Sequence, residues 1–193
     1  MYGPPATRRY TQQPMATDQH APLPDELKHA LSRDFFIRFT MVGRRTGAPR
    51  TTETTFVWNA QSASPNRIYV SGYPGKRDYV ANALADPTVT IHTVERGIYY
   101  DIAAVARVIT DRNDRTGPLL AFLDRWANRP EGKQRVFSWL IGAIKINRRL
   151  HLPWWGPFYL ARRIMDRMPC VELTFVGPAI RRLTPPPPST SDR

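Results

Sequence analysis

Alternating apolar and polar positions in the first half of the chain predict a series of β-strands. Residues 35–42 are aromatic and β-branched, and residues 50–58 are rich in threonine and partly alternate. Three further strands are predicted at residues 67–71, 88–94 and 98–110. A short helix fits between the third and fourth strands, with Asp78 as its N-cap and Pro87 after its end. Sequential strands joined by short connections favour an antiparallel barrel over a parallel sheet.

Apolar positions in the second half of the chain follow helical spacing instead. Helices are predicted at residues 114–128, 131–149 and 161–167, and a last strand at residues 168–176. Residues 152–160, which precede the third of these helices, are aromatic and interrupted by prolines. The pattern therefore predicts an α+β protein that is mainly β. It has a barrel of about six strands, a short helix after strand 3, and a helical insert at about residues 113–167 before the last strand.

Composition separates two tails from a single folded domain. Residues 1–24 are rich in proline, threonine and glutamine and lack the apolar core of a signal peptide. Residues 184–193 contain four consecutive prolines followed by serine and threonine. Both tails are predicted to be disordered, which leaves residues 25–183 as the domain. No segment has the roughly 20 apolar residues of a membrane span, so a cytoplasmic location is expected.

The charge of the chain narrows the choice of ligands. Its 193 residues include 28 Lys or Arg and 16 Asp or Glu, a net charge of +12. The positive electrostatic field of such a chain attracts nucleotide cofactors, nucleic acids or anionic membranes. Alternatively, the charge only keeps the protein soluble. The basic residues are not interleaved with aromatic ones along a strand face, so no nucleic-acid partner is expected. With a single cysteine, Cys170, and scattered histidines, neither a disulfide within the chain nor a metal site is expected.

Two basic, glycine-bearing turns are the candidate anion-binding elements. The first, residues 43–50, joins the first two predicted strands, and the second, residues 74–78, precedes the short helix. Backbone N–H groups of such turns, together with fixed cations, can hold a phosphate. Two of them in one short region suggest a polyanionic small molecule bound across both. For the first turn taken alone, a solvated hairpin tip with its arginines in water is the alternative.

These turns resemble two sequence motifs of the deazaflavin-dependent nitroreductase family, whose split β-barrel is related to the flavin-binding pyridoxamine-phosphate-oxidase barrels. The first family motif is a Gly-Arg-(Arg/Lys)-(Ser/Thr)-Gly-x-Pro-Arg hairpin, matched by Gly43, Arg44, Arg45, Thr46, Gly47, Pro49 and Arg50. The second is a glycine-bearing loop, an aromatic residue, an Asn three positions later and Ala-x-Pro, matched by Gly75, Tyr79, Asn82, Ala85 and Pro87. The aromatic position is usually Trp in the family, so Tyr79 departs from the pattern.

The resemblance implies a split barrel and an oxidoreductase that uses the reduced deazaflavin coenzyme F420, an 8-hydroxy-5-deazaflavin. The phosphodiester and oligoglutamate tail of this coenzyme are anionic, which suits arginine and lysine. The residues expected to bind it are Gly43, Arg44, Arg45, Thr46, Gly47, Arg50, Thr52, Ser71, Gly75, Lys76, Arg77, Tyr79 and Asn82. Hydride transfer needs neither a protein nucleophile nor a metal. An FMN- or haem-binding split barrel and a non-catalytic deazaflavin-binding protein are the alternatives.

The helical insert gives an indication of the kind of molecule that accepts the hydride. Tyr159 is the candidate proton donor, or else it packs in the aromatic cluster around Trp154 and Trp155. Basic residues beside Trp and Leu make the insert either a lid on the barrel or a contact to the inner face of a membrane. Both alternatives favour an apolar acceptor, such as a quinone, a nitroaromatic or an enone-like compound. The resemblance is also compatible with a homodimer.

Overall fold

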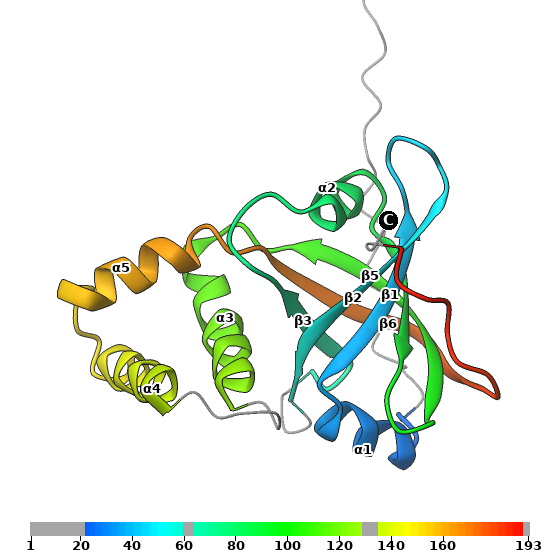
Figure 1. The fold of residues 1–193 in the computed structure, drawn as a ribbon, viewed down its shortest axis with the longest axis horizontal. Coiled ribbons are helices and arrows are strands. Elements are labelled where there is room, and N and C mark those ends of the chain that lie inside the picture. Colours follow the sequence, from blue (N-terminus) through cyan, green and yellow to red (C-terminus); the bar gives the residue numbers. More distant parts are fainter. Residues whose placement is uncertain (1–21, 60–63, 129–134, 191–193) are drawn as a thin grey trace, which may run out of the picture.

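Six antiparallel strands close into a barrel, which lies beside a group of helices (Figure 1). The computed structural model describes residues 22–59, 64–128 and 135–190. The strands are β1 (Phe36–Val42), β2 (Pro49–Trp58), β3 (Arg67–Ser71), β4 (Thr88–Thr93), β5 (Tyr99–Val108) and β6 (Cys170–Arg182). They follow the order β1-β2-β3-β6-β5-β4 around the barrel, and β4 pairs with β1 to close it. The predicted six-stranded barrel is therefore confirmed.

The alternation of side chains along the strands fills the barrel. Ile37, Phe39 and Met41 of β1 point inward and are buried, whereas Phe36 and Val42 on the same strand are exposed. The largest fully buried side chains that the other strands contribute to this core are Phe56, Ile68, Ile91, Ile102, Leu173 and Phe175. Burial of this apolar surface is the main stabilising contribution to the barrel.

Strand β6 is longer than predicted, since it continues to Arg182 instead of ending at Gly177 and Pro178. Its pairing with β5 is irregular where Ile102 faces Ala179 and Ala104 faces Phe175. Gly177 and Pro178 lie within this irregularity, where Pro has no ladder hydrogen bond to make. The glycine and proline therefore shift the register without ending the strand.

Two short helices cover the ends of the barrel. Helix α1 (Asp25–Arg33), which was not predicted, buries Leu27, Ala30 and Leu31 against one end, and their i, i+3, i+4 spacing is the signal for it. Helix α2 (Asp78–Ala85) lies at the other end beside the β1–β2 loop (Figure 1). Asp78 is its first residue and not its cap: Arg77 occupies the cap position, without a side-chain cap bond. The Asp78 carboxylate still favours the positive end of the helix.

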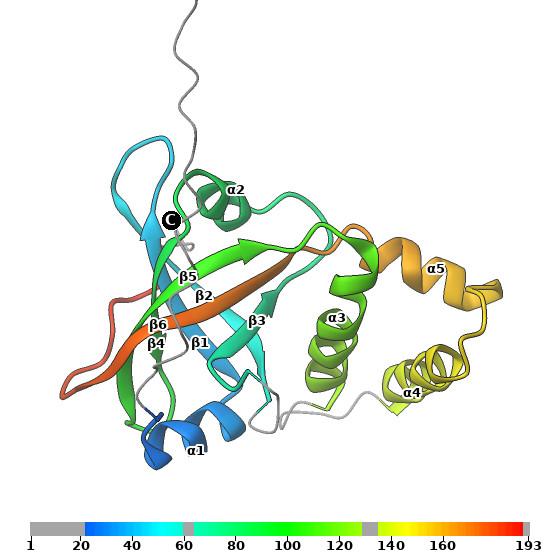
Figure 2. The same cartoon turned by 180° about the vertical axis from the view of Figure 1, so that it is seen from behind.

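The insert forms a helical lobe beside the barrel, built from α3 (Arg112–Ala127), α4 (Arg135–Arg149) and α5 (Gly156–Met165). Figure 2 shows α3 next to the barrel and α4 and α5 farther out. A second apolar core, with Leu119, Phe122 and Ile144, holds the lobe together. Asp111 caps α3 by accepting from two backbone N–H groups, so this helix begins before residue 114.

One prediction for the lobe, the start of α5, needs correction, and part of another lies outside the described residues. Helix α5 begins at Gly156, five residues before the predicted start, because a proline in the first turn of a helix is tolerated. Residues 131–134 of the helix predicted at 131–149 lie outside the described residues. No helix in the described parts of the chain is both long and apolar enough to cross a bilayer.

The C-terminal residues 184–190 run along the outside of β1 and β2 instead of forming the predicted disordered tail. Arg38 donates to the backbone oxygen of Pro187 over 3.2 Å. The Thr190 N–H donates to the Thr51 oxygen over 2.8 Å, and the Thr51 N–H donates to the Thr190 hydroxyl over 3.0 Å. These bonds extend the pairing of β2 outward and hold the segment in place. Residues 1–21 and 191–193 of the predicted tails lie outside the described residues.

A buried carboxylate lies where α1 meets β1. The side chain of Asp34 is 2% exposed and lies 3.3 Å from the Arg96 guanidinium group. Burial, and then the Glu95 carboxylate, raise the pKa of Asp34 to about 6, although Arg96 and Arg125 act in the opposite direction. The folded protein therefore holds this proton more tightly than the unfolded chain does.

The free energy of unfolding is expected to fall as the pH rises through this range. Since the folded-state pKa of Asp34 is raised, its contribution is complete below about pH 4 and is lost as the pH passes about 6. The shift corresponds to about 3 kcal/mol. Urea unfolding at a series of pH values would measure it, with Asp34→Asn as the control that cannot ionise. An equal decline in both proteins would contradict the assignment.

Candidate functional site

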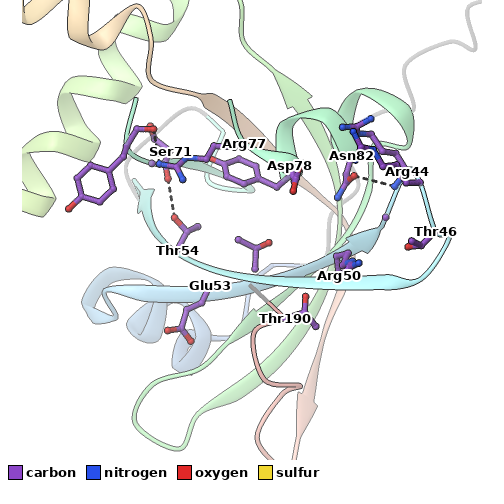
Figure 3. A pocket seen from close by; sticks show the side chains of 16 residues that line it. Arg44, Thr46, Arg50, Glu53, Thr54, Ser71, Arg77, Asp78, Asn82 and Thr190 are labelled. Carbon is purple, nitrogen blue, oxygen red and sulfur yellow. Dashed lines mark hydrogen bonds between the residues drawn. The ribbon is translucent and has the colours of Figure 1, made fainter. Parts of the chain in front are cut away.

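A groove of about 760 Å³ opens between the β1–β2 loop, the start of α2 and the face of β2 that carries Thr52 and Thr54 (Figure 3), which is the inner face of the strand because these residues pair with Phe39 and Ile37. Five segments supply its lining: the loop, β2, the end of β3 with the turn after it, α2, and the C-terminal segment. The lining residues are Gly43, Arg44, Arg45, Thr46, Arg50, Thr52, Glu53, Thr54, Ser71, Gly72, Tyr73, Arg77, Asp78, Tyr79, Asn82 and Thr190. The structure thus brings together the two basic turns that the sequence singles out.

One end of the groove is strongly cationic. The side chains of Arg44, Arg45 and Arg50 are exposed there, and none forms an ion pair with another described residue. The nearby Glu53 carboxylate points away from Arg50 (Figure 3) and pairs with Arg38 over 2.7 Å. Because no described carboxylate pairs with them, these arginines are available for an anionic ligand.

The loop that carries these arginines is tightly closed. The Gly43 N–H donates to the Ala48 oxygen over 2.9 Å, and the Gly47 N–H donates to the Gly43 oxygen over 2.8 Å. A Cβ on Gly43 would lie 3.1 Å from the Ala48 oxygen, which is tighter than ordinary contact. Gly47 has a φ of 67°, a left-handed conformation that favours glycine. Both glycines therefore shape the loop, and the arginines on it are held by a defined backbone.

Asn82 joins α2 to the arginine loop. Its side-chain oxygen accepts from the Arg44 backbone N–H over 3.2 Å (Figure 3), and the residue is buried. Asn82 is predicted from the sequence to bind the cofactor, and its oxygen in the structure is instead engaged with the protein. It therefore orients the loop, in addition to any contact of its amide N–H groups with a ligand.

Replacing Asn82 with alanine is expected to lower the free energy of unfolding by about 1–2 kcal/mol, because the Arg44 N–H loses its acceptor. Chemical denaturation would measure the loss. Asn82→Asp retains an acceptor oxygen and is the matched control, which should lose less. Equal losses in the two variants would show that the bond to Arg44 contributes little.

Hydroxyl groups line the wall opposite α2. Thr52 and Thr54 lie on the same side of β2, two residues apart, as alternation requires. Thr54 donates to the Ser71 oxygen over 3.0 Å, and the Ser71 hydroxyl donates to the Pro169 oxygen over 2.6 Å. Since their protons are engaged, Thr54 and Ser71 can only accept hydrogen bonds from a ligand, whereas the Thr52 hydroxyl can donate.

A buried phenol lies at the base of the groove. Tyr79 is 8% exposed, and its ring packs edge-to-face on Phe39 at 5.6 Å between centroids. Its hydroxyl is buried and has no hydrogen-bond partner among the described residues, and a Cβ on Gly72 would lie 3.6 Å from it. Burial raises the pKa of Tyr79 well above its usual value, so the phenol stays neutral. A buried, unpartnered O–H beside a groove is a donor for a ligand.

The barrel is similar to known structures. A conserved hypothetical protein from Mycobacterium tuberculosis is 9% identical, with 85% of this chain and 88% of that chain covered and a TM-score of 0.55. A protein from Clostridium acetobutylicum, related to general stress protein 26 and to the pyridoxinephosphate oxidase family, is 8% identical, with 86% and 94% covered and a TM-score of 0.50. The fold is a split β-barrel. At these identities the likeness shows the fold alone. No family model matches the chain, and no curated protein is detectably similar in sequence.

In this split barrel, four residues singled out from the sequence lie outside the groove lining. Gly47, Gly75 and Lys76 are in the two turns but do not line it. Tyr159, the candidate proton donor, is exposed on α5 and does not line it either. Its catalytic role stays a prediction. No group of His, Cys, Asp and Glu within the described ranges could hold a metal ion.

Six lining residues were not predicted: Glu53, Thr54, Gly72, Tyr73, Asp78 and Thr190. The alternation of β2 places Thr54 on the same face as Thr52, so the strand pattern carried a signal for it. No sequence pattern predicted Thr190 as a lining residue, because its position depends on the path of the chain after β6. Its bonds to Thr51 place it at the edge of the groove.

Proposed function

We propose that this chain is an oxidoreductase that binds the reduced deazaflavin coenzyme F420 in the groove and reduces an apolar acceptor. The observation that carries the proposal is that one groove combines a cationic end, formed by Arg44, Arg45 and Arg50, with a buried Tyr79 hydroxyl that has no hydrogen-bond partner in the described parts of the chain. The motif resemblance supports the choice of coenzyme. The likeness to a protein of the pyridoxinephosphate oxidase family supports redox chemistry on this fold.

The lining fits the chemistry of this coenzyme. Its phosphodiester and glutamate tail need several cations, and the three arginines at one end, which form no ion pair with a described residue, would supply them. The Thr52 hydroxyl and the Tyr79 hydroxyl are donors for the polar edge of a ring system. The volume, about 760 Å³, is in the range of cofactor sites. FMN, with one phosphate and no glutamate tail, would leave part of the cationic end without a partner.

When bound, the reduced coenzyme supplies the hydride. The role of the protein is then to fix the donor against the acceptor and to exclude competing reactions. The arginines anchor the anionic part of the coenzyme, and the Asn82 bond keeps the loop that carries Arg44 in position. The neutral Tyr79 phenol donates a hydrogen bond and does not itself titrate near neutral pH. Quinones, nitroaromatics and enone-like compounds are the proposed acceptors.

The experiment that tests the proposal is a fluorescence titration of the purified protein with oxidised coenzyme F420, with FMN and haem in parallel. Micromolar binding of the deazaflavin with none of FMN supports the cofactor assignment. Reduction of menadione or a nitroaromatic by the reduced coenzyme then tests turnover. Binding without turnover of any acceptor would indicate a carrier of the coenzyme, and binding of FMN or haem alone would overturn the cofactor.

A further inference from the structure

The outer lobe, which we define as residues 138–167 of α4, α5 and the turn between them, exposes an amphipathic surface that the groove does not use. We propose that this outer lobe docks on the surface of a membrane that contains anionic lipids. The inference does not depend on the proposed coenzyme.

One face of α4 carries exposed apolar side chains in a stripe. Trp139 is 73% exposed, and Ile146 and Leu150 are each 62% exposed. Leu150 directly follows the last residue of α4, and its N–H keeps the helical bond to the Ile146 oxygen, so intervals of seven and four residues place the three on the same side. Ile141 and Ile144, on the other side, are buried. The stripe therefore faces away from the core of the lobe, and exposed apolar side chains grouped on one face can mark an interaction site.

The exposed apolar side chains continue through the turn onto α5. Trp155, just before the helix, is 57% exposed, and Tyr159, Leu160 and Ile164 on the helix are also exposed. Leu160 and Ile164 are one helical turn apart and so lie side by side. Tyr159, which does not line the groove, thus belongs to the exposed apolar residues of the outer lobe.

The same surface is basic. Residues 138–167 include six Lys or Arg and one acidic residue, Asp166. That carboxylate pairs with Arg112 of α3 over 3.1 Å. Arg149 and Arg163 are exposed and form no ion pair with a described residue. Arg149 is the last residue of α4 and immediately precedes Leu150, and Arg163 is one turn from Tyr159 on α5, so each of these two cations is close in the chain to an exposed apolar residue.

Two further arginines hold the turn between the helices. The Arg148 guanidinium carbon lies 5.5 Å from the ring centroid of Trp154, and that of Arg162 lies 5.3 Å from it. Asn147 is buried and donates to the Leu152 oxygen over 3.3 Å. These contacts fix how α4 and α5 meet, so the apolar and basic side chains are presented on a defined framework.

An anionic lipid surface is the occupant that matches this chemistry. Trp and Tyr favour the headgroup level of a bilayer, where basic side chains reach the lipid phosphates. Each Lys or Arg near an anionic surface increases binding about fivefold. A second copy of the outer lobe would bring like charges together, which disfavours self-association through this face. Because no described helix can cross a bilayer, the contact is with the membrane surface.

The test uses sedimentation of the full chain with vesicles of phosphatidylcholine alone and of an equal mixture with phosphatidylglycerol. We expect at least about tenfold tighter binding to the mixed vesicles, weakening as salt is added. Fluorescence of the exposed tryptophans should shift to shorter wavelength on binding. Absence of binding to the mixed vesicles, or equal binding to both compositions, would overturn the proposal.

Variants locate the contact on the outer lobe. Arg149→Glu with Arg163→Glu should weaken binding by about 25-fold or more, and Trp139→Ala with Trp155→Ala by about tenfold or more. Lys28→Glu with Arg33→Glu changes the net charge equally on α1, and Leu84→Ala with Leu183→Ala removes exposed apolar side chains elsewhere. These controls should bind as the unchanged protein does.

Two outcomes would contradict the assignment. Equal weakening in the outer-lobe variants and in their controls would mean that overall charge, and not this surface, binds the vesicles. A homodimer of the unchanged protein in solution that the two tryptophan substitutions dissociate would mean that the surface contacts a second copy. All four of the changed pairs are exposed, so circular dichroism should show that each variant remains folded.

Discussion

Replacing Arg45 and Arg50 together by alanine is expected to weaken binding of the deazaflavin coenzyme by on the order of 10²–10³-fold. Both side chains line the cationic end of the groove and have no ion-pair partner among the described residues. A charge-assisted bond to phosphate or carboxylate contributes about 2 kcal/mol, so two of them contribute about 4 kcal/mol. The coenzyme fluorescence titration measures the loss directly.

The control for this variant removes the same charge elsewhere. Arg33 on α1 and Arg163 on α5 are exposed and do not line the groove, so Arg33→Ala with Arg163→Ala should leave the affinity within about twofold. An unchanged affinity in the Arg45 and Arg50 variant would remove the loop from the binding site. Equal weakening in both double variants would indicate attraction by net charge alone.

Replacing Phe39 with alanine is expected to lower the free energy of unfolding by about 3–5 kcal/mol. The ring is fully buried in the barrel, and truncation leaves a cavity that rigid neighbouring strands cannot fill. It also removes the edge-to-face contact with Tyr79, at 5.6 Å between centroids. The phenol at the base of the groove then loses part of its support, so ligand affinity should fall together with stability.

Phe36→Ala is the matched control, because Phe36 lies on the same strand and on its outer side, 37% exposed. Its replacement should cost about 1 kcal/mol or less. Urea unfolding of the two variants gives both values. Similar losses in the two would contradict the inward and outward assignment of β1.

The strands were accessible from the sequence because each carries its own signal. Period-two alternation and flanking turn residues predict β1 to β5 within one or two residues at each end. The end of β6 was not accessible, since Gly177 and Pro178 are turn residues in most settings. Here both residues lie within β6, at a point where its register with β5 is irregular. Whether the strand continues past them depends on its pairing with β5.

The groove was accessible in part for a similar reason. Both basic turns are recognisable in the sequence by their glycine and arginine residues, and the structure places them on the same groove. The sequence pattern could not predict which hydrogen bonds each of these side chains makes. Whether the Ser71 proton is free, whether the Asn82 oxygen is engaged and whether the Tyr79 hydroxyl has a partner all depend on residues distant in sequence.

The position of β6 has a consequence for the order of folding. This strand lies between β3 and β5, yet it comes about 100 residues after β3 in the chain. During synthesis, the edges of β3 and β5 that pair with β6 therefore stay unpaired until the helical lobe and then the last strand have been synthesised. Contacts of such long sequence separation form slowly, and open edges invite pairing between chains. Truncation before Cys170 would thus leave an open, aggregation-prone sheet and not a smaller barrel.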